Sequence, residues 1–597
     1  MGLINKPKQP LVVGKVRQSQ AITTFGIGSM VDFVSQTAMI NGLDDWDWCY
    51  DNEYKINNLN LQNLLGVKYF VKPKISLKEK KWGKDNPDLP ATIFPKTLYN
   101  PKCKKLSEAG KRDCALKNDA YKCYCEKCRG KNQYFPSRFV LVCPKGHIED
   151  FPYSWWVHEG QGKKRCEDNP QMKMYYTGNK TDMESLYVEC SNCGAKRSMK
   201  TASARNVFSK YKCTGNRPWL GDKEKCSAGD DEHMQMLIRN ESSVYFPYTI
   251  SALTIPPWST KIAKEIQKTK LDFEKVMGPI TESDKPRLID NLCKKMPNVD
   301  EEFIKELLEK LLDKENQQVQ TTQTIMEDEY DAIIRQKRED QNGDFVSHAE
   351  DVPEEFNHII DSVIAIDRLT VVTAMVGFTR LTAPTRYNDE NMAPISKTKK
   401  DWYPGIEQHG EGVFIKFNQN ILNSWVNKNA ERYLEMGKKL EKSFFYNDRF
   451  SPQYVFLHTF AHLFIRELSN LCGYSAAAIK ERVYSTFKGS KKEMAGVLVY
   501  TSTSDSDGSL GGLIEQAQKV KIEIILKSMI ERGKWCSSDP ICYISKEQGF
   551  MSLNYAACFA CTLLPETSCE FNNILLDRCS VCGMPGNEDL GLFNWRK

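Results

Sequence analysis

Residues 123–147 read CYCEKCRGKNQYFPSRFVLVCPKGH, and this stretch decides how the N-terminal part of the chain folds. It contains Cys125-x2-Cys128 and then Cys143-x3-His147, a two-knuckle spacing that lets four ligands close a tetrahedron around Zn²⁺. The run PSRFV between the two pairs predicts a connecting strand. The stretch therefore predicts a zinc ribbon that depends on its metal, because it has little core of its own.

Two further sets of four cysteines have spacings of the same kind. One is the knuckle Cys190-x2-Cys193-Gly194 completed by Cys213 and Cys226, and the other comprises Cys536, Cys542, Cys558 and Cys561. All three sets are full, whereas a catalytic zinc keeps one position open for water. We therefore expect three structural Zn²⁺ ions, or four if a further set forms.

The remaining cysteines leave alternatives open. Cys123 can replace Cys125 in the first set, and Cys569 can serve as a fourth ligand in the third. Cys579-x2-Cys582-Gly583 is another knuckle without an obvious second pair, so it either joins Cys569 in a fourth site or stays an unoccupied thiol pair. The other six fit no metal spacing and read as buried thiols: Cys49, Cys103, Cys114, Cys166, Cys293 and Cys472.

The expected cellular compartment favours metal binding over disulfide formation for the clustered cysteines. No apolar run approaches the roughly 18 residues of a membrane span, and the N-terminus MGLINKPKQPLVVGKVR lacks the apolar segment of a signal peptide. We therefore expect a cytoplasmic protein with no membrane association. In a reducing compartment, clustered cysteines are more often metal ligands than disulfides.

Length and composition predict a multidomain α+β protein. The chain has 597 residues, of which 41% are hydrophobic and 27% are charged. This length exceeds what a single hydrophobic core usually supports. The fold class expected is an N-terminal zinc-ribbon-containing region followed by a mixed α/β C-terminal domain with a terminal zinc site. The expected segments are a basic α+β region, a zinc-ribbon region with two zinc sites, a helical and linker region, and a four-cysteine domain, at 1–120, 121–258, 259–360 and 361–597.

Several elements can be predicted from local pattern. Ser451 as N-cap, Pro452 in the first turn and Gly473 as the stop predict a helix over 452–471. We also expect a buried strand over 495–501, a tight turn over 504–512 and a helix over 513–530. An apolar stripe at three- and four-residue steps predicts helices over 260–320, the segment 326–355 is expected to be part helix and part linker, and 362–381 is buried and β-branched in character.

One polar stripe interrupts the predicted apolar helix. His458, His462, Arg466 and Asn470 are spaced by four and share a face. The sequence HTFAH is similar to the H-E-x-x-H zinc motif, but Thr459 stands where the glutamate base would be. A metal site stays open as an alternative, and an internal hydrogen-bond network is the favoured interpretation.

Charge is unevenly distributed along the chain. Residues 1–140 carry 24 Lys and Arg against 13 Asp and Glu, a net charge of +11. Because the whole chain has a net charge of +6, residues 141–597 sum to −5. A basic surface attracts polyanions through counterion release, so we predict DNA contacts from one lysine run, with a solvated loop as the alternative. The predicted contacts are Lys78, Lys80, Lys81 and Lys84.

Motifs of several enzyme classes are absent from the sequence. It contains no G-x-x-x-x-G-K-[ST], no H-x-K pair of the phospholipase D kind and no G-x-S-x-G. The glycine-rich turn at 504–512 offers backbone N–H groups to an anion, but Asp505 and Asp507 oppose that use, and a structural turn is favoured. The chain is therefore not expected to be an ATPase, a nuclease of that kind or a serine hydrolase.

Several long motifs together resemble the DrmB family of the DISARM anti-phage defence system. They are QSQAITTFGIGSMVDF near the start, RFVLVCPKGHIEDFPYSWWVH at 138–158, SSVYFPYTISALTIPP at 242–257, GFTRL at 377–381, FLHTFAHLFIRELSNLCGYSAAAIKERVY at 456–484, TSDSDGSLGGL at 503–513, and SSDPIC with LNYAACFACTLLPETSCEFNNILLDR at the end.

The resemblance implies a partner and a role. It implies a helicase-like ATPase, DrmA, acting with this chain on invading DNA, and a C-terminal domain shared with MrfA-like helicases whose cysteines fall on Cys536, Cys542, Cys558, Cys561 and Cys569. The expected function is a non-catalytic, DNA-engaging subunit that recognises or loads invading DNA. The alternative is a metal-dependent nuclease or other DNA-processing enzyme around His458, His462 and the Asp505/Asp507 pair.

Overall fold

The structure is a computed structural model that describes residues 12–594 except 35, 75–87, 118–119, 167–169, 230, 258–260, 298, 317–319, 336–343, 385–388, 444, 446 and 502–511. Helices and sheets are mixed throughout, as the sequence predicts. The chain forms two compact units. The first contains Met1–Ile56, Tyr69–Ile250 and Ala374–Ile406, and the second contains Asn57–Lys68, Ser251–Thr373 and Glu407–Lys597. The four-segment division expected along the chain stays a prediction.

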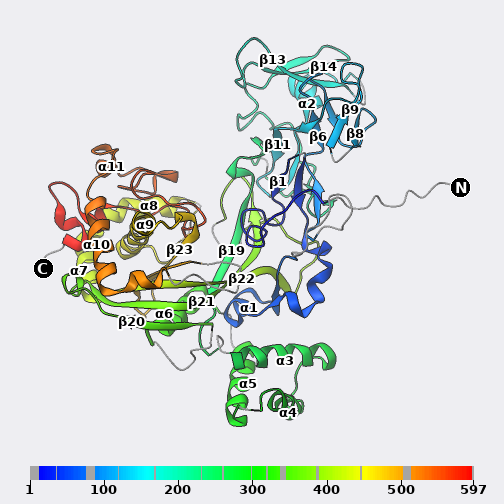
Figure 1. The fold of residues 1–597 in the computed structure, drawn as a ribbon. Coiled ribbons are helices and arrows are strands. Elements are labelled where there is room, and N and C mark those ends of the chain that lie inside the picture. Colours follow the sequence, from blue (N-terminus) through cyan, green and yellow to red (C-terminus); the bar gives the residue numbers. More distant parts are fainter. Residues whose placement is uncertain are drawn as a thin grey trace. The chain divides into compact units, whose positions relative to one another are not determined.

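The first unit is built from small antiparallel sheets and hairpins (Figure 1). Its sheets are β1-β2-β5, β10-β6-β7, β12-β11-β18 and β13-β14-β15, and its hairpins are β8-β9 and β16-β17. The strands are β1 Met30–Asp32, β2 Thr37–Ile40, β5 Ala91–Ile93, β6 Thr97–Tyr99, β7 Leu106–Glu108, β8 Cys114–Lys117, β9 Ala120–Cys123, β10 Phe135–Pro136, β11 Phe139–Val142, β12 Ile148–Asp150, β13 Met172–Tyr176, β14 Leu186–Cys190, β15 Lys196–Ser198, β16 Asn216–Arg217, β17 Asp222–Lys223 and β18 Gln235–Ile238. Each sheet is small, and apolar side chains from several of them meet in shared buried cores.

A fully buried arginine ties several loops of the first unit together. The guanidinium of Arg380 donates hydrogen bonds to the carbonyls of Gly146, Val244 and Gly28, at 2.8, 2.7 and 2.9 Å. Burial lowers the pKa of Arg380 to about 9. Because the buried guanidinium is satisfied by backbone carbonyls, it fixes the loop that presents Cys143 and His147.

A large sheet with helices packed against it lies mostly in the second unit, and three of its strands continue into residues of the first. Its strands run in the order β19-β21-β22-β24-β23, with β20 also pairing with β21. The bounds are β19 Phe246–Leu253, β20 Val346–Glu350, β21 Ile360–Thr379, β22 Trp402–Phe417, β23 Ile479–Ser485 and β24 Ala495–Thr501. The strand predicted over 495–501 is confirmed as β24, and most of the buried, β-branched stretch 362–381 forms β21. Strand β20 lies in the segment expected to be helix and linker.

Helix α9 Pro452–Cys472 is the centre of the second unit and confirms the predicted helix. The Ser451 side chain accepts a hydrogen bond from the backbone N–H of Tyr454, and Gly473 ends the helix in the left-handed conformation at φ 75°. The helix lies against β23 and β24 and also contacts helices α7 Gln419–Asn429, α10 Lys519–Gly533 and α12 Cys579–Cys582 (Figure 1). Most of its side chains are therefore buried, and the exposed ones lie in its last turn.

The other helices follow their apolar stripes. The predicted helical region over 260–320 contains α3 Lys261–Met277, α4 Lys285–Lys295 and α5 Glu301–Asn316. Most of the α5 stripe is buried, whereas Leu312 is half-buried and Phe303 is 41% exposed. The predicted helix over 513–530 begins later, at Lys519, because Gln518 is extended and a short 3-10 turn precedes it. The remaining helices are α1 Leu59–Leu65, α2 Tyr153–Val157, α6 Thr322–Arg335, α8 Leu434–Lys442 and α11 Ile541–Ile544. Among the described residues, no helix combines the length and apolar character of a membrane span.

Candidate metal centres

The described residues form four clusters in which only cysteine and histidine ligand atoms meet, each within 4.8 Å. We name them the hairpin cluster, the ribbon cluster, the helix cluster and the C-terminal cluster. In that order they comprise Cys103, Cys123, Cys125 and Cys128; Cys143, His147, Cys213 and Cys226; His158, Cys166, Cys190 and Cys193; and Cys536, Cys542, Cys558 and Cys561.

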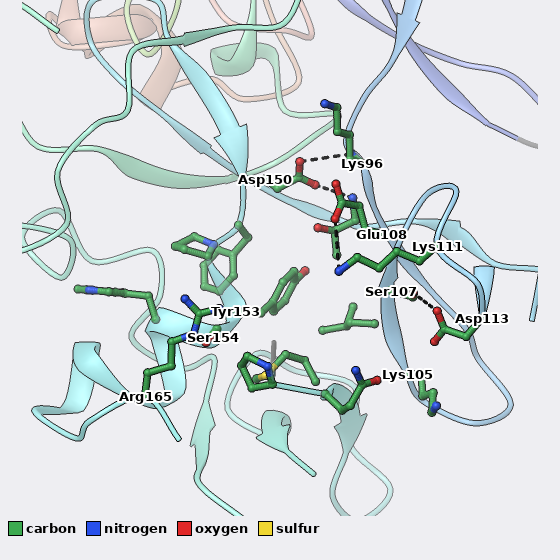
Figure 2. Close-up of a pocket in the computed structure, with 18 of the residues that line it drawn as sticks. Lys96, Lys105, Ser107, Glu108, Lys111, Asp113, Asp150, Tyr153, Ser154 and Arg165 are labelled. Atoms are coloured by element: carbon green, nitrogen blue, oxygen red, sulfur yellow. Dashed lines mark hydrogen bonds and ion pairs between the residues drawn. The ribbon is translucent and has the colours of Figure 1, made fainter. Parts of the chain in front are cut away.

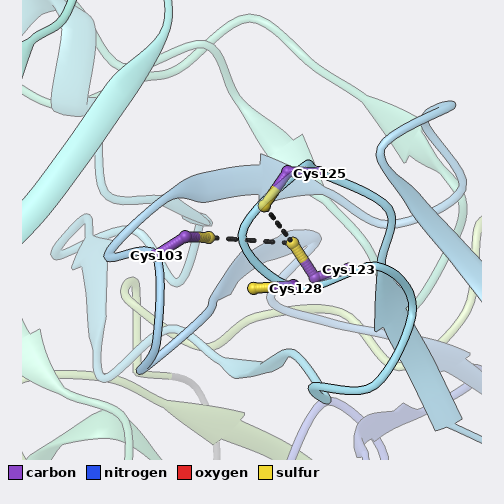
Figure 3. Close-up of side chains that lie close together, drawn as sticks. All are labelled: Cys103, Cys123, Cys125 and Cys128. Carbon is purple, nitrogen blue, oxygen red and sulfur yellow. Dashed lines mark hydrogen bonds between the residues drawn. The ribbon is translucent and has the colours of Figure 1, made fainter.

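The hairpin cluster is arranged by the β8-β9 hairpin and two turns. Cys123 ends β9, and the turn that follows, with the N–H of Cys128 donating to the carbonyl of Cys125 at 3.1 Å, turns the chain back. Cys103 arrives from a second turn, in which the Asn100 side chain accepts from the backbone N–H of Cys103 at 3.1 Å. Figure 3 shows the four thiols converging, with Cys123 Sγ 3.7 Å from Cys103 Sγ and 3.5 Å from Cys125 Sγ.

The sulfur spacings distinguish a shared metal from a disulfide. Two sulfurs bound to one tetrahedral zinc at about 2.3 Å lie about 3.7 Å apart, whereas a disulfide brings them to about 2.05 Å. The separations are 3.6 Å for Cys143 and Cys226, 3.5 Å for Cys166 and Cys190, and 3.8 Å for Cys542 and Cys561. The clusters therefore have the dimensions of zinc sites.

The ribbon cluster includes a histidine with its orientation fixed from outside. His147 lies between β11 and β12, its Nδ1 is 3.5 Å from Cys213 Sγ, and its Nε2 is 2.9 Å from Glu224 Oε1. Arg217 pairs with Glu224 and with Asp222. Because a carboxylate on the far nitrogen fixes the tautomer and raises ligand basicity, Nδ1 is presented as the metal-binding atom.

In the helix cluster a hydrogen bond also orients the histidine ring, but here Nε2 is the nitrogen that faces the cysteines. His158 follows α2, and its Nδ1 lies 2.8 Å from the carbonyl oxygen of Ser154, which makes Nδ1 the donor. Its Nε2 then faces Cys193 Sγ at 3.3 Å. Cys190 ends β14, and Gly194 provides the left-handed turn of the knuckle at φ 72°.

The C-terminal cluster sits beside a buried arginine. Arg578 donates to the carbonyl of Gly533 at 2.8 Å and pairs with Asp539, whose carboxylate in turn accepts the backbone N–H of Cys536. The N–H of Ser538 points at Cys536 Sγ at 3.4 Å. Hydrogen bonds of this kind stabilise thiolates, the form that binds metal.

In each cluster one thiol has a lowered pKa. The hydrogen bond from Cys143 and the nearby His147 lower the pKa of Cys213 to about 4, and that from Cys542 lowers the pKa of Cys561 to about 5. Burial opposes the shift at Cys125, but hydrogen bonds from Cys123 and Cys128 lower its pKa to about 7. The backbone N–H of Ala195 and the His158 ring lower that of Cys193 to about 7.

The structure groups the predicted ligands differently from the sequence interpretation. The knuckle of Cys125 and Cys128 does not face that of Cys143 and His147; it is completed by Cys103 and Cys123. The β11-β18 pairing, with Val142 opposite Gln235, places the preceding segment, which contains Cys213 and Cys226, on Cys143 and His147. Cys190 and Cys193 are left to His158 and Cys166. The predicted C-terminal set is brought together as expected.

Four cluster members were missed or undervalued by sequence reasoning. In the sequence, Cys103 and Cys166 fit no metal spacing, Cys123 fits only as a replacement for Cys125, and His158 belongs to no ligand motif. The one signal available was the density of cysteines before Cys125, since His158 and Cys166 belong to no short spacing. Cys569 lies with His458, outside the C-terminal cluster, and Cys579 and Cys582 are buried in α12 outside every cluster of the described residues. Lys78, Lys80, Lys81, Lys84, Asp505 and Asp507 lie outside the described residues.

A large open cavity of about 1480 Å³ lies in the first unit, lined by the turn that carries Lys111 and by residues next to the helix cluster. Five cationic side chains line it: Lys96, Lys105, Lys111, Arg112 and Arg165. In Figure 2, Lys105 and Lys111 lie on one side, Arg165 lies on the other, and Tyr153 lies between them. Aromatic rings form part of the wall, with Phe151 and Tyr153 centred 4.8 Å apart.

Four carboxylates line the cavity; three of them are hydrogen-bonded or ion-paired, and the fourth, Glu159, is exposed. Glu108 pairs with Lys111, and Asp113 accepts from Ser107 at 2.7 Å. Asp150 accepts the backbone N–H of Thr97 at 2.7 Å. By contrast, the side chains of Lys96, Lys105 and Arg112 form no ion pair with the described residues. The five cations outnumber the four carboxylates of the lining, and three of the cations remain available to an anion.

Comparisons with known proteins define the class first. Residues 460–562 match the MrfA Zn-binding domain, a range that contains all four cysteines of the C-terminal cluster. Residues 17–246, which contain the other three clusters, match a domain of unknown function, DUF8724. The chain is thus a protein with a C-terminal zinc-binding domain of the MrfA kind.

A full-length relative defines the family. The chain is 35% identical over 588 residues to "DISARM protein DrmB" of Bacillus paralicheniformis, with 92% of this chain and 97% of the relative covered. The chain belongs to the DrmB family of DISARM proteins.

Proposed function

We propose that this chain is a non-catalytic, DNA-engaging subunit of a DISARM anti-phage defence complex, acting in the cytoplasm beside a helicase-like ATPase of the DrmA kind. The observation that carries DNA engagement is the cavity of the first unit, in which uncommitted cations and aromatic rings line one open space. A positive groove with aromatic platforms is how proteins bind single strands without reading sequence.

The size and composition of the cavity support a polymeric ligand. Its volume of about 1480 Å³ exceeds the roughly 300–1,000 Å³ of small-molecule sites. Lys105 and Arg112 supply charge for phosphates, while the half-buried Trp155 and the exposed Tyr124 supply ring faces. Phosphate contacts position a strand and carry no sequence information, so we expect binding that is nearly independent of sequence.

The zinc ions are proposed to be structural, four per chain. Each cluster offers four protein ligands, which closes a tetrahedral shell and leaves no position for a substrate or water. The three clusters of the first unit cross-link segments that lie between its small strands, and the C-terminal cluster holds the segment around Cys542 and Cys561. Zinc therefore organises the unit whose cavity is proposed to bind DNA.

A binding experiment tests the proposal. The purified chain is titrated against fluorescent single-stranded and duplex oligonucleotides of unrelated sequence, with anisotropy as the readout, and is then co-expressed with the helicase-like ATPase for co-purification. We expect salt-dependent binding of all sequences alike and a stable complex. Absence of DNA binding both alone and in that complex contradicts the DNA-engaging role.

The nuclease alternative has a separate test. His458 and His462 have fully buried side chains, so a DNA phosphate has no access to them in this conformation. We expect DNA incubated with the chain and Mg²⁺ or Mn²⁺ to remain intact. Cleavage that is lost in a His458→Ala variant would establish the enzyme instead.

A further inference from the structure

A fifth cluster of ligand-type side chains lies inside the second unit, away from the four cysteine clusters. His458 and His462 are one turn apart on α9 and face Glu481 on β23, and Cys569 approaches from the loop after the C-terminal cluster. The side chains of both histidines and of Glu481 are 0% exposed. One ligand atom from each of the four residues lies within 4.8 Å of the others.

The separations match one shared ion. His458 Nε2 is 3.0 Å from Glu481 Oε1 and 3.3 Å from Cys569 Sγ, and His462 Nε2 is 3.4 Å from Glu481 Oε1. Nitrogen and oxygen ligands of a tetrahedral zinc at about 2.0–2.1 Å lie about 3.3 Å apart, and a nitrogen and a sulfur about 3.6 Å apart.

The ring of His462 is oriented as a ligand. Its Nδ1 lies 3.0 Å from the carbonyl oxygen of Thr562, so Nδ1 carries the proton and Nε2 carries a lone pair in the neutral ring. That Nε2 makes no hydrogen bond with the described residues although it faces the carboxylate of Glu481. Glu481 Oε2 likewise has no hydrogen-bond partner among them. The oxygen that faces His462 Nε2 is Glu481 Oε1, which also accepts the backbone N–H of Glu570 at 3.0 Å. Two buried acceptors that face each other call for a cation between them.

The sulfur of Cys569 has the environment of the sulfurs in the other clusters. It accepts backbone N–H groups from Phe571 at 3.3 Å and Asn573 at 3.2 Å. The same contact from two residues onward occurs at Cys213, from Gly215 at 3.4 Å, and recurs at Cys226 and Cys536. Burial raises the pKa of Cys569 well above its usual range, and the two N–H groups oppose that shift by stabilising the thiolate, the form that binds metal.

We propose that His458, His462, Glu481 and Cys569 bind a further Zn²⁺ ion, distinct from the C-terminal cluster, that fastens α9 to β23 and to the loop of Cys569. Two nitrogens, one oxygen and one sulfur suit zinc, and four protein ligands close its shell. The site is structural, because the buried ion has no open position. A tethered α9 fixes the position of the helix that forms the centre of the second unit.

One residue links this site to the C-terminal cluster. The hydroxyl of Thr562 donates to Cys561 Sγ at 3.2 Å, and the carbonyl of the same residue accepts from His462 Nδ1. Thr562 therefore supports a ligand of each site, as outer residues of metal centres do.

The competing interpretation is an ion-free network in which the two histidines hold the carboxylate. Substituting Cys569 distinguishes the two interpretations. In the ion-free network Cys569 is a peripheral hydrogen-bond partner of His458, whereas in the metal site it is a ligand. Cys472, a half-buried thiol at the end of the same helix and outside every cluster of the described residues, provides the matched control.

Zinc per chain is measured by native mass spectrometry on the full wild-type chain, Cys569→Ser and Cys472→Ser. We expect Cys569→Ser to hold one zinc fewer than the wild type and Cys472→Ser to hold the same number. Equal zinc in a folded Cys569→Ser protein overturns the proposal. This difference does not depend on DNA binding or on how many of the other clusters are loaded.

If Cys569→Ser does not fold, a zinc-edge anomalous difference map of the wild-type crystal decides. A peak within bonding distance of His458, His462, Glu481 and Cys569 supports the site. A map with peaks at cysteine clusters and none at these four residues contradicts it.

Discussion

The Nε2 atom of His147 lies 2.9 Å from the Oε1 atom of Glu224, on the side of the ring opposite Cys213. We expect Glu224→Gln to weaken zinc retention by the ribbon cluster by about 10–100-fold, the usual effect of losing such a partner. Zinc release to a chromophoric chelator measures this. Glu184→Gln, which removes only an exposed pair with Lys200, should release zinc like the wild type, and equal release by both variants would contradict the role of Glu224.

The hairpin cluster predicts different behaviour for two neighbouring thiols. Cys103 lies in the cluster, whereas Cys114, buried and directly opposite Cys123 in the β8-β9 register, does not. Cys103→Ser should lose one zinc per chain and lower the melting temperature, because structural zinc contributes folding free energy. Cys114→Ser should keep its zinc. Elemental analysis of the two purified proteins checks this, and full zinc in Cys103→Ser would remove Cys103 from the site.

A buried ion pair stabilises the second unit independently of metal. Arg482 bonds Glu329 at 2.6 Å and 3.0 Å, and both side chains are almost fully buried. Glu329→Gln leaves the arginine charge unbalanced, so we expect a loss of about 3–5 kcal/mol from the free energy of unfolding of that unit. Asp361→Asn removes a partly exposed pair with Lys416 and should cost no more than about 1 kcal/mol. Urea denaturation compares them, and equal losses would refute the argument.

Local signals predicted elements well, and long-range pairing was beyond them. Ser451, Pro452 and Gly473 bound α9 because caps depend only on neighbours in the chain. The partner of the Cys143 and His147 knuckle depends instead on β11 pairing with β18, a contact between segments far apart in sequence. The sequence therefore suggests that the knuckle of Cys143 and His147 shares a zinc with the preceding knuckle, whereas the fold brings it to Cys213 and Cys226. His158 belongs to the helix cluster but forms no short ligand spacing with another Cys or His, so the sequence pattern does not reveal it.

The lysine run of the N-terminal region stays a prediction from sequence. Replacing Lys78, Lys80, Lys81 and Lys84 by Ala should weaken DNA binding for all sequences alike and flatten its salt dependence, if these lysines contact phosphates. Anisotropy titrations over a range of salt concentrations measure both quantities. An unchanged affinity and salt slope would show that the run is a solvated loop.

The central claim, DNA engagement through the cavity of the first unit, is tested most directly by the salt dependence of single-strand binding in a Lys105→Ala, Arg112→Ala double variant. The control is Lys294→Ala with Lys305→Ala, which removes two exposed lysines of the second unit. Each lost phosphate contact should reduce the slope of log affinity against log salt by about 0.7. The account predicts weaker binding and a shallower slope for the cavity variant alone. Identical isotherms for the cavity variant, the control and the wild type would contradict it.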